Sequence, residues 1–159
     1  MSKIIKGDIT KVITSGYIMH QTNYYGNMGA GVAKAIAKKW PAVNHAYKQY
    51  CQQVKLPTAL FGQMQLVKAN DNLTIVNSFT EWYANDHIIN APHRASLHGA
   101  NTDEDKLIAN IQTMATIAAE HDTTLAIPAR IGSGIANGDW HKIHNAIKDI
   151  DNLIIVNFN

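Results

Sequence analysis

The sequence predicts a single α/β domain. Short apolar segments of the strand type alternate with segments of helical periodicity over much of the chain. The length of 159 residues suits one domain with a sizeable core, and the 46% apolar and 16% charged fractions are those of an ordinary globular protein. Because no repeat, linker or low-complexity tract divides the sequence, residues 1–159 are expected to fold as one unit.

The N-terminal half supplies strands and two consecutive helices. A helix is predicted over residues 32–40, where Val32, Ala35 and Ile36 recur at helical spacing. Pro41 begins the next helix, through about residue 54, since proline suits the first helical position. A hairpin turn is expected at residues 70–72. The expected strands are residues 4–5, 17–22, 63–69 and 73–79.

The C-terminal half begins with a long polar segment, residues 80–102, which is predicted to be a loop. Loops of this length inside a compact domain are usually functional or mobile. Residues 103–120 follow as a helix, and Asp139 caps a last helix, through residue 147, by accepting its free N–H groups. The long helix has an apolar stripe of Leu107, Ile111, Met114, Ala115 and Ala118. The remaining strands are expected at residues 125–128 and 153–158.

Charge and cysteine content limit the classes of function. A net charge of +2 and a pI near 8.6 do not favour a nucleic-acid partner, but they allow a pocket to accept an anionic ligand. The lone Cys51 excludes an internal disulfide and fits a reducing compartment. Because no run of roughly 18 apolar residues and no secretion-signal pattern occurs, we expect a cytoplasmic monomer without a membrane partner.

Two glycine-rich loops carry the chemistry. Each follows a predicted buried strand and leads towards a helix: residues 26–31 follow the strand that ends near Asn23, and residues 132–138 follow Pro128. Glycine allows close approach and positive φ, so that successive N–H groups can face phosphate oxygens. In open α/β sheets ligands bind beyond the carboxyl ends of strands, so two such loops could close on one diphosphate. The alternative is that both are merely tight turns.

The familiar phosphate motifs do not fit these loops. Lys34 stands where the dinucleotide fingerprint needs its third glycine after Gly29 and Gly31, and no Gly-Lys-Ser/Thr tripeptide of a P-loop exists. The spacing of His87, His93 and His98 matches no established set of metal ligands. We therefore expect neither a cofactor nor a metal, and an unrelated dinucleotide enzyme is disfavoured.

Several segments in order resemble the macro domain family. These are Lys6-Gly7-Asp8-Ile9-Thr10, then residues 18–23 (Ile-Met-His-Gln-Thr-Asn), 29–36 (Gly-Ala-Gly-Val-Ala-Lys-Ala-Ile) and 127–140 around Gly132-Ser133-Gly134. Each motif alone is loose, but the ordered set is specific and spans nearly the whole chain. The resemblance implies a three-layer α/β/α fold with a mixed central sheet and an ADP-ribose cleft at strand ends.

The resemblance also implies roles for individual residues. Asp8 would accept from the adenine amino group, the Ile9 backbone would contact the ring, and Asn23 would bind the distal ribose. Backbone amides of the first loop would hold that ribose and a phosphate, and those of the second would wrap the diphosphate. These amides belong to Gly29, Ala30, Gly31, Val32 and Ala33, and to Gly132, Ser133, Gly134, Ile135 and Ala136. From the residues alone, a turn or cap residue is the preferred interpretation of Asp8.

Macro domains either only bind ADP-ribose or also hydrolyse bonds at its distal ribose, and the chain departs from two hydrolytic branches. Ala33 and Ala136 stand where those branches place acidic residues, and no lysine lies between Lys68 and Lys106 to form a Schiff base. His20 matches the histidine of the phosphatase-type branch. The resemblance therefore implies an ADP-ribose 1″-phosphate phosphatase or a related ADP-ribosyl hydrolase, and the alternative is a non-catalytic reader of ADP-ribose.

His20 is accordingly the main catalytic candidate. An imidazole that titrates near neutrality could act as general base for water attacking a terminal phosphate, or could hydrogen-bond that phosphate. Asp86, in the long loop, is a candidate acidic partner. The alternative is a structural histidine at the end of a buried strand, bonded to the backbone.

Overall fold

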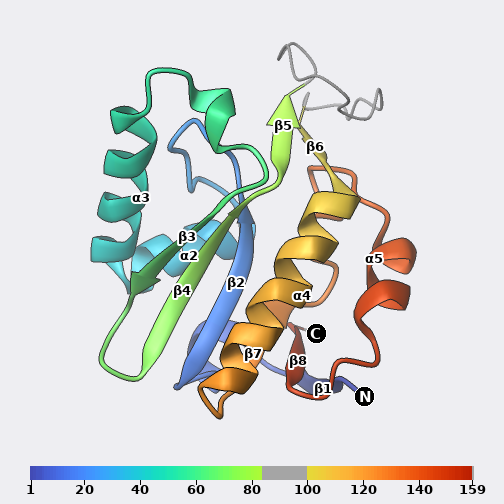
Figure 1. Cartoon of the computed structure of the whole chain (residues 1–159). Helices are drawn as coiled ribbons and strands as arrows, with labels where there is room; N and C mark the ends of the chain where they lie inside the picture. Colours follow the sequence, from blue (N-terminus) through green and yellow to red (C-terminus); the bar gives the residue numbers. More distant parts are fainter. Residues whose placement is uncertain (84–99, 159) are drawn as a thin grey trace.

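A mixed six-stranded sheet forms the centre of the computed structural model, which describes residues 1–83 and 100–158 (Figure 1). All neighbouring strands are parallel except β3 and β4, which form the predicted hairpin. The predicted mixed sheet is therefore confirmed. In spatial order the strands are β1 (Lys3–Lys6), β8 (Leu153–Asn157), β7 (Leu125–Pro128), β2 (Gly16–Thr22), β4 (Leu73–Phe79) and β3 (Met64–Lys68).

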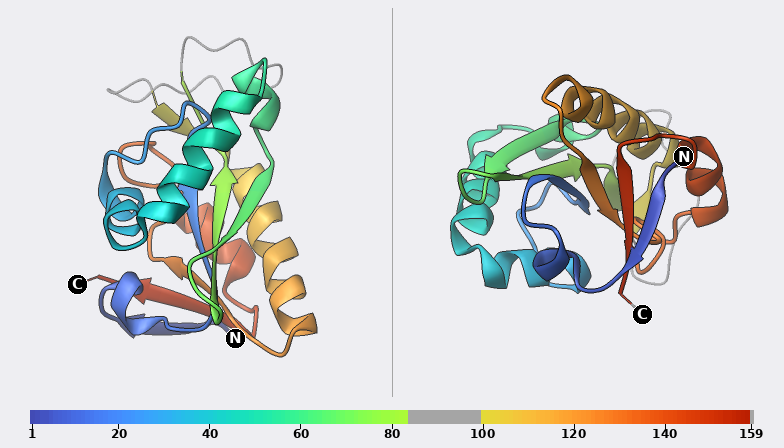
Figure 2. Two further views of the ribbon diagram at one scale, coloured as in Figure 1. Left: turned by 90° about the vertical axis from the view of Figure 1, so that its left-hand side faces the viewer. Right: turned by 90° about the horizontal axis from the view of Figure 1, so that it is seen from below.

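Helices cover both faces of this sheet, as the three-layer prediction requires (Figure 2). The first face packs against α1 (Ile9–Val12), α2 (Gly31–Lys39) and α3 (Pro41–Gln53), and the second against α4 (Glu104–Glu120) and α5 (Trp140–Ile147). Alternation along each strand divides the core between the layers. In β2, for example, Ile18 belongs to the first cluster and Met19 to the second, with the predicted apolar stripe of α4.

Most predicted elements are confirmed to within a residue or two, and so is the predicted cap of α5. Asp139 is the N-cap of α5 and accepts from the backbone N–H of Lys142 at 3.2 Å. Asp103 caps α4 in the same way, through the N–H of Lys106 at 3.0 Å. Both caps satisfy N–H groups that have no partner inside the helix.

Four short elements were not predicted: α1, the 3₁₀ helix η1 (Pro57–Leu60), β5 (Glu81–Tyr83) and β6 (Ala100–Thr102). The prediction of an uninterrupted loop over residues 80–102 is wrong at its ends, because β5 and β6 pair there as an antiparallel ribbon. Each of these elements is three or four residues long. Segments that short carry almost no periodicity, and a pairing between residues some twenty positions apart is decided by tertiary contacts.

The topology brings two loops to one edge of the sheet. β2 and β7 run parallel as neighbours, with Ile18 opposite Ala126, so the segments that follow Thr22 and Pro128 leave the sheet on the same side. These are the two predicted glycine loops. In the described part of the chain, no helix has both the length and the apolar character needed to cross a membrane.

Candidate functional site

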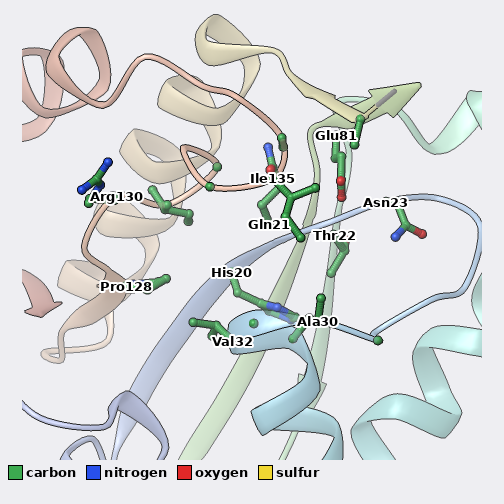
Figure 3. Close-up of a pocket in the computed structure, with 18 of the residues that line it drawn as sticks. His20, Gln21, Thr22, Asn23, Ala30, Val32, Glu81, Pro128, Arg130 and Ile135 are labelled. Carbon is green, nitrogen blue, oxygen red and sulfur yellow. The ribbon is translucent and has the colours of Figure 1, made fainter. Parts of the chain in front are cut away.

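A pocket of about 560 Å³ lies where the two glycine loops meet, beyond the carboxyl ends of β2 and β7 (Figure 3). That volume is within the usual range for small-molecule sites, and strand ends are the usual place for them in open sheets. Its wall includes most of the predicted ligand residues. They are Asn23, Gly29, Ala30, Gly31, Val32 and Ala33 from the first loop and helix α2, and Gly132, Gly134, Ile135 and Ala136 from the second loop.

The first loop presents the N-terminus of α2 to this pocket. Ala30 is the N-cap of α2 and makes no side-chain capping bond, so the first N–H groups of the helix are not satisfied by a capping side chain. Gly31 has a φ of +58°, a left-handed conformation that glycine adopts at little cost. Free N–H groups and the helix dipole together favour an anion at this end of the pocket.

Asn23 holds the first loop in shape. Its Nδ2 donates to the carbonyl of Asn27 at 2.9 Å, and its Oδ1 accepts from the backbone N–H of Tyr25 at 2.9 Å. The hydroxyl of Tyr47 on α3 donates to the same Oδ1 at 2.8 Å. One of the two Nδ2 protons has no bond among these contacts, so it can donate to a bound ligand. The predicted contact to a ribose stays a prediction.

The second loop is tied to β6 and closed on itself. The Thr102 hydroxyl donates to the carbonyl of Gly132 at 2.6 Å, and the N–H of Gly138 donates to that same carbonyl at 2.8 Å. Gly132 has a φ of +70°, and Arg130 has a φ of +62°. Arg130 also lines the pocket, and its side chain is exposed. A non-glycine residue in this conformation is strained, and such strain is concentrated at functional sites.

A chain of three hydrogen bonds determines which nitrogen of His20 carries the proton. The backbone carbonyl of Ala46 can only accept, so Gln65 offers it the Nε2 group at 3.2 Å and turns Oε1 towards Asn77. Asn77 donates its Nδ2 to that Oε1 at 3.0 Å, which leaves its Oδ1 to face His20 Nε2 at 2.6 Å. The Nε2 of His20 is therefore the donor, and Nδ1 carries the lone pair.

His20 is neutral over the physiological range. Its side chain is 1% exposed, and burial lowers the pKa of the imidazole from 6.5 to about 4, against the smaller opposing effect of the bond to Asn77. The expectation of an imidazole that titrates near neutrality is therefore wrong. The predicted alternative of a histidine bonded to the backbone is not what the structure has either, because its partner is the Asn77 side chain.

Two buried polar atoms of β2 lack a partner at the floor of the pocket. Within the described residues, neither His20 Nδ1 nor Thr22 Oγ1 has a hydrogen-bond partner, and both residues belong to the pocket wall. They lie two positions apart on one strand and so on one face of the sheet. Buried polar groups are normally bonded, so a pair of unsatisfied ones beside a pocket favours a site that a polar ligand completes.

Glu81 is a pocket residue that the sequence analysis missed. It is the first residue of β5, and its side chain is largely removed from water in the pocket wall. Burial raises the pKa of this carboxyl group from 4.5 to about 7. Because Glu81 lies in a segment that reads as a polar loop, no sequence signal distinguishes it from a solvated surface glutamate.

Other predicted residues lie elsewhere. Asp8, Ile9 and Ser133 are described, but they are not among the residues that line this pocket. Asp8 caps α1, accepting from the Thr10 N–H at 2.9 Å and hydroxyl at 2.7 Å, bonds that lower the pKa of its carboxyl group. Its predicted contact with adenine is not tested by these bonds and stays a prediction. Asp86 and the histidines at 87, 93 and 98 lie outside the described residues.

Known proteins resemble this chain over nearly its whole length. A protein of Candida albicans named ADP-ribose 1″-phosphate phosphatase is 25% identical over 158 residues, covering 96% of each chain. A protein of the same name from Meyerozyma guilliermondii is 26% identical over 172 residues, covering 98% of each. The solved structure of a macrodomain protein from Streptomyces coelicolor superimposes with a TM-score of 0.71 at 18% identity, covering both chains completely.

The family comparison agrees with this fold and with the order of the motifs. The model of the macro domain family matches residues 19–147, from within β2 to the end of α5. The matched range includes both glycine loops, the end of β2 and the whole of β4, β3 and β7, and it leaves out β1 and β8 at one edge of the sheet. The chain belongs to the macro domain family.

Proposed function

We propose that this macro domain binds ADP-ribose and hydrolyses the phosphate ester of ADP-ribose 1″-phosphate or a closely related bond at the distal ribose. The observation that carries the proposal is a pocket that two amide-rich loops share, with the Nδ1 of His20, which has no partner among the described residues, at its floor. The names of the two yeast relatives support this substrate class at about 25% identity.

The diphosphate would be held mainly by backbone groups. The uncapped N-terminus of α2 and the loop around Gly134 supply N–H donors from opposite sides of the pocket. Arg130, also in the wall, adds a cation that could form paired hydrogen bonds with phosphate oxygens. Backbone donors are preorganised and need no side-chain ordering, which suits the recognition of a fixed, doubly charged group.

His20 would act through the lone pair on Nδ1. A neutral imidazole with its N–H directed to Asn77 can accept a hydrogen bond from water or a sugar hydroxyl, but it cannot donate one to a phosphate. A group with a pKa of about 4 is a weak base at neutral pH. We therefore assign His20 to orienting the attacking water, the part of its predicted role that is compatible with this protonation state.

Two measurements test the function. Calorimetry should detect binding of ADP-ribose, and a phosphate-release assay should detect turnover of ADP-ribose 1″-phosphate. His20→Ala should reduce kcat by roughly 10²-fold with little change in ADP-ribose affinity. His45→Ala, which changes an exposed histidine of α3, is the matched control and should retain full activity.

The outcomes separate the candidate functions. Binding of ADP-ribose without phosphate release would replace the hydrolase by the reader of ADP-ribose that the sequence left open. No binding of ADP-ribose would contradict both. Turnover that is unchanged in His20→Ala would support the proposed reaction and show that His20 has no role in it.

A further inference from the structure

Among the residues that the structure describes, one carboxyl group lines the pocket. It belongs to Glu81, and the nearby positions in both loops that could have carried an acid, Ala33 and Ala136, carry methyl groups. Figure 3 shows the Glu81 side chain extending into the pocket on the side of Thr22 and Asn23. Any reaction in this pocket that needs a carboxyl group from the described residues must therefore use Glu81.

Strand register accounts for this position. Phe79, the last residue of β4, lies opposite Thr22, the last residue of β2, and Glu81 follows two residues later. The side chain therefore projects just beyond the carboxyl end of β2, next to the loop that begins with Asn23. The contact between Asn23 and the distal ribose, which the family resemblance implies, would bring the scissile bond of the proposed reaction to this loop.

The surroundings of Glu81 raise the pKa of its carboxyl group. The other titratable or charged side chains of the described pocket wall are those of His20, Tyr83 and Arg130. Tyr47 on α3 is also close enough to Glu81 that the charge of the carboxylate raises the pKa of the Tyr47 hydroxyl. None of them is a cause of its raised pKa, and the cause among the described residues is desolvation by burial. The carboxyl group of Glu81 therefore keeps its proton to a higher pH than an exposed glutamate does.

The two titratable groups of the pocket have opposite preferences. Desolvation makes the carboxyl group of Glu81 available as an acid near neutrality, whereas His20 has already lost its proton. Pairs of groups whose environments push their pKa values apart are typical of acid and base assignments in active sites. The neutral form of Glu81 also avoids repulsion with the dianionic terminal phosphate of the proposed substrate.

We propose that Glu81 is the general acid of the hydrolysis, a role that rests on the proposed function. Water forms a bond to phosphorus as the bond from phosphorus to the 1″ oxygen breaks. The electron pair of that bond goes to the 1″ oxygen, which takes the proton of Glu81 and leaves as the hydroxyl of ADP-ribose. The phosphate product holds both protons of the water and returns one to the Glu81 carboxylate before it departs.

The test is the pH profile of phosphate release by Glu81→Gln, which keeps the shape of the side chain but cannot give up a proton. In the wild type, kcat should fall as the pH rises above about 7. In Glu81→Gln, kcat at pH 7 should fall by roughly 10²- to 10⁴-fold and this alkaline decrease should disappear. ADP-ribose affinity should change by less than about threefold, since no proton transfer occurs in binding.

Two further variants complete the design. Glu120→Gln makes the same chemical change on the surface of α4 and should keep the wild-type profile. Glu81→Asp retains an acid that is one methylene shorter, so it should keep an alkaline decrease with a lower kcat. It provides the decisive comparison if Glu81→Gln does not fold.

The possible failures are distinguishable. If the wild type releases phosphate and Glu81→Gln keeps its kcat within about threefold, or keeps the alkaline decrease, Glu81 is not the acid and the proposed function stands. Full kcat with an unchanged profile in Glu81→Asp contradicts the role equally. If the wild type binds ADP-ribose but releases no phosphate, the proposed hydrolysis and the role of Glu81 are both wrong.

Discussion

His20 and Asn77 lie side by side in register on two parallel strands, and the Nε2 atom of His20 is 2.6 Å from the Oδ1 atom of Asn77. Both residues are almost completely buried, at 1% and 0% exposed. This bond determines the tautomer of the imidazole, and burial of the pair determines its charge. The chemistry available at the floor of the pocket therefore depends on a contact between residues 57 positions apart.

The buried imidazole should make the stability of the protein depend on pH. The folded pKa of about 4 lies below the ordinary value of 6.5, so the unfolded chain binds the proton more tightly. The free energy of unfolding should therefore have its full value above pH 6.5, where His20 is neutral in both states. It should fall by about 3 kcal/mol as the pH is lowered from 6.5 to 4. Urea unfolding at a series of pH values measures this slope.

His20→Gln supplies the comparison, since glutamine does not titrate. Between pH 6.5 and 4, the decrease in its free energy of unfolding should be about 3 kcal/mol smaller than the decrease in the wild type. His45→Gln, at an exposed position, should follow the wild type. Identical slopes in all three proteins would mean that folding does not shift the pKa of His20.

The Asn23 side chain should be required for the stability of the first loop whether or not a ligand contacts it. Asn23→Ala removes four bonds, two with the backbone of Asn27 and one each with Tyr25 and Tyr47, and should lower the free energy of unfolding by roughly 2–4 kcal/mol. Tyr47→Phe removes only the hydroxyl that bonds Asn23, and should cost about 1–2 kcal/mol. A loss below about 0.5 kcal/mol for Asn23→Ala in urea unfolding would show that these bonds are not stabilising.

Two glycines of the second loop should respond differently to alanine. Gly132 has a φ of +70°, and a Cβ there would lie 3.0 Å from the Thr102 side chain, so Gly132→Ala should cost about 1–3 kcal/mol of stability. A Cβ at Gly134 meets nothing within 4 Å, so stability should change by less than about 0.5 kcal/mol.

Gly134→Ala is also a probe of ligand binding that leaves the fold intact. Gly134 lines the pocket, and the added methyl group would stand where a diphosphate approaches the backbone. The affinity for ADP-ribose should fall by about tenfold or more in calorimetry. Unchanged affinity in a fully stable Gly134→Ala protein would indicate that the ligand does not contact this part of the loop.

Arg130 should contribute to affinity through its charge. Arg130→Ala should weaken ADP-ribose binding by roughly 5- to 30-fold at low salt, and the difference from the wild type should shrink as salt is added. Lys148→Ala, which removes a cation at the end of α5 and outside the pocket wall, is the control and should bind normally. A loss of equal size at every ionic strength would indicate that Arg130 acts by shaping the backbone, where its φ is +62°.

The local parts of this structure could be predicted from the sequence. Helical periodicity located α2 and α4, and Pro41 marked the start of α3. A short polar residue before an apolar run identified Asp139 as a cap, because such signals act within one or two turns of the chain. The two glycine loops were found for the same reason. The short elements α1, β5 and β6 were missed, since three or four residues leave no periodic pattern.

The amino-acid sequence by itself determined the type of domain, the order of its main elements and the loops able to offer N–H groups to a phosphate. Only the tertiary structure decided the chemistry of the pocket. His20 is neutral because burial in the core lowers the pKa of its imidazole, and Asn77 fixes which nitrogen holds the remaining proton. Glu81 keeps its proton to a higher pH than usual because burial in the pocket wall raises the pKa of its carboxyl group. Charge states depend on desolvation and on partners distant in sequence, and those exist only once the chain has folded.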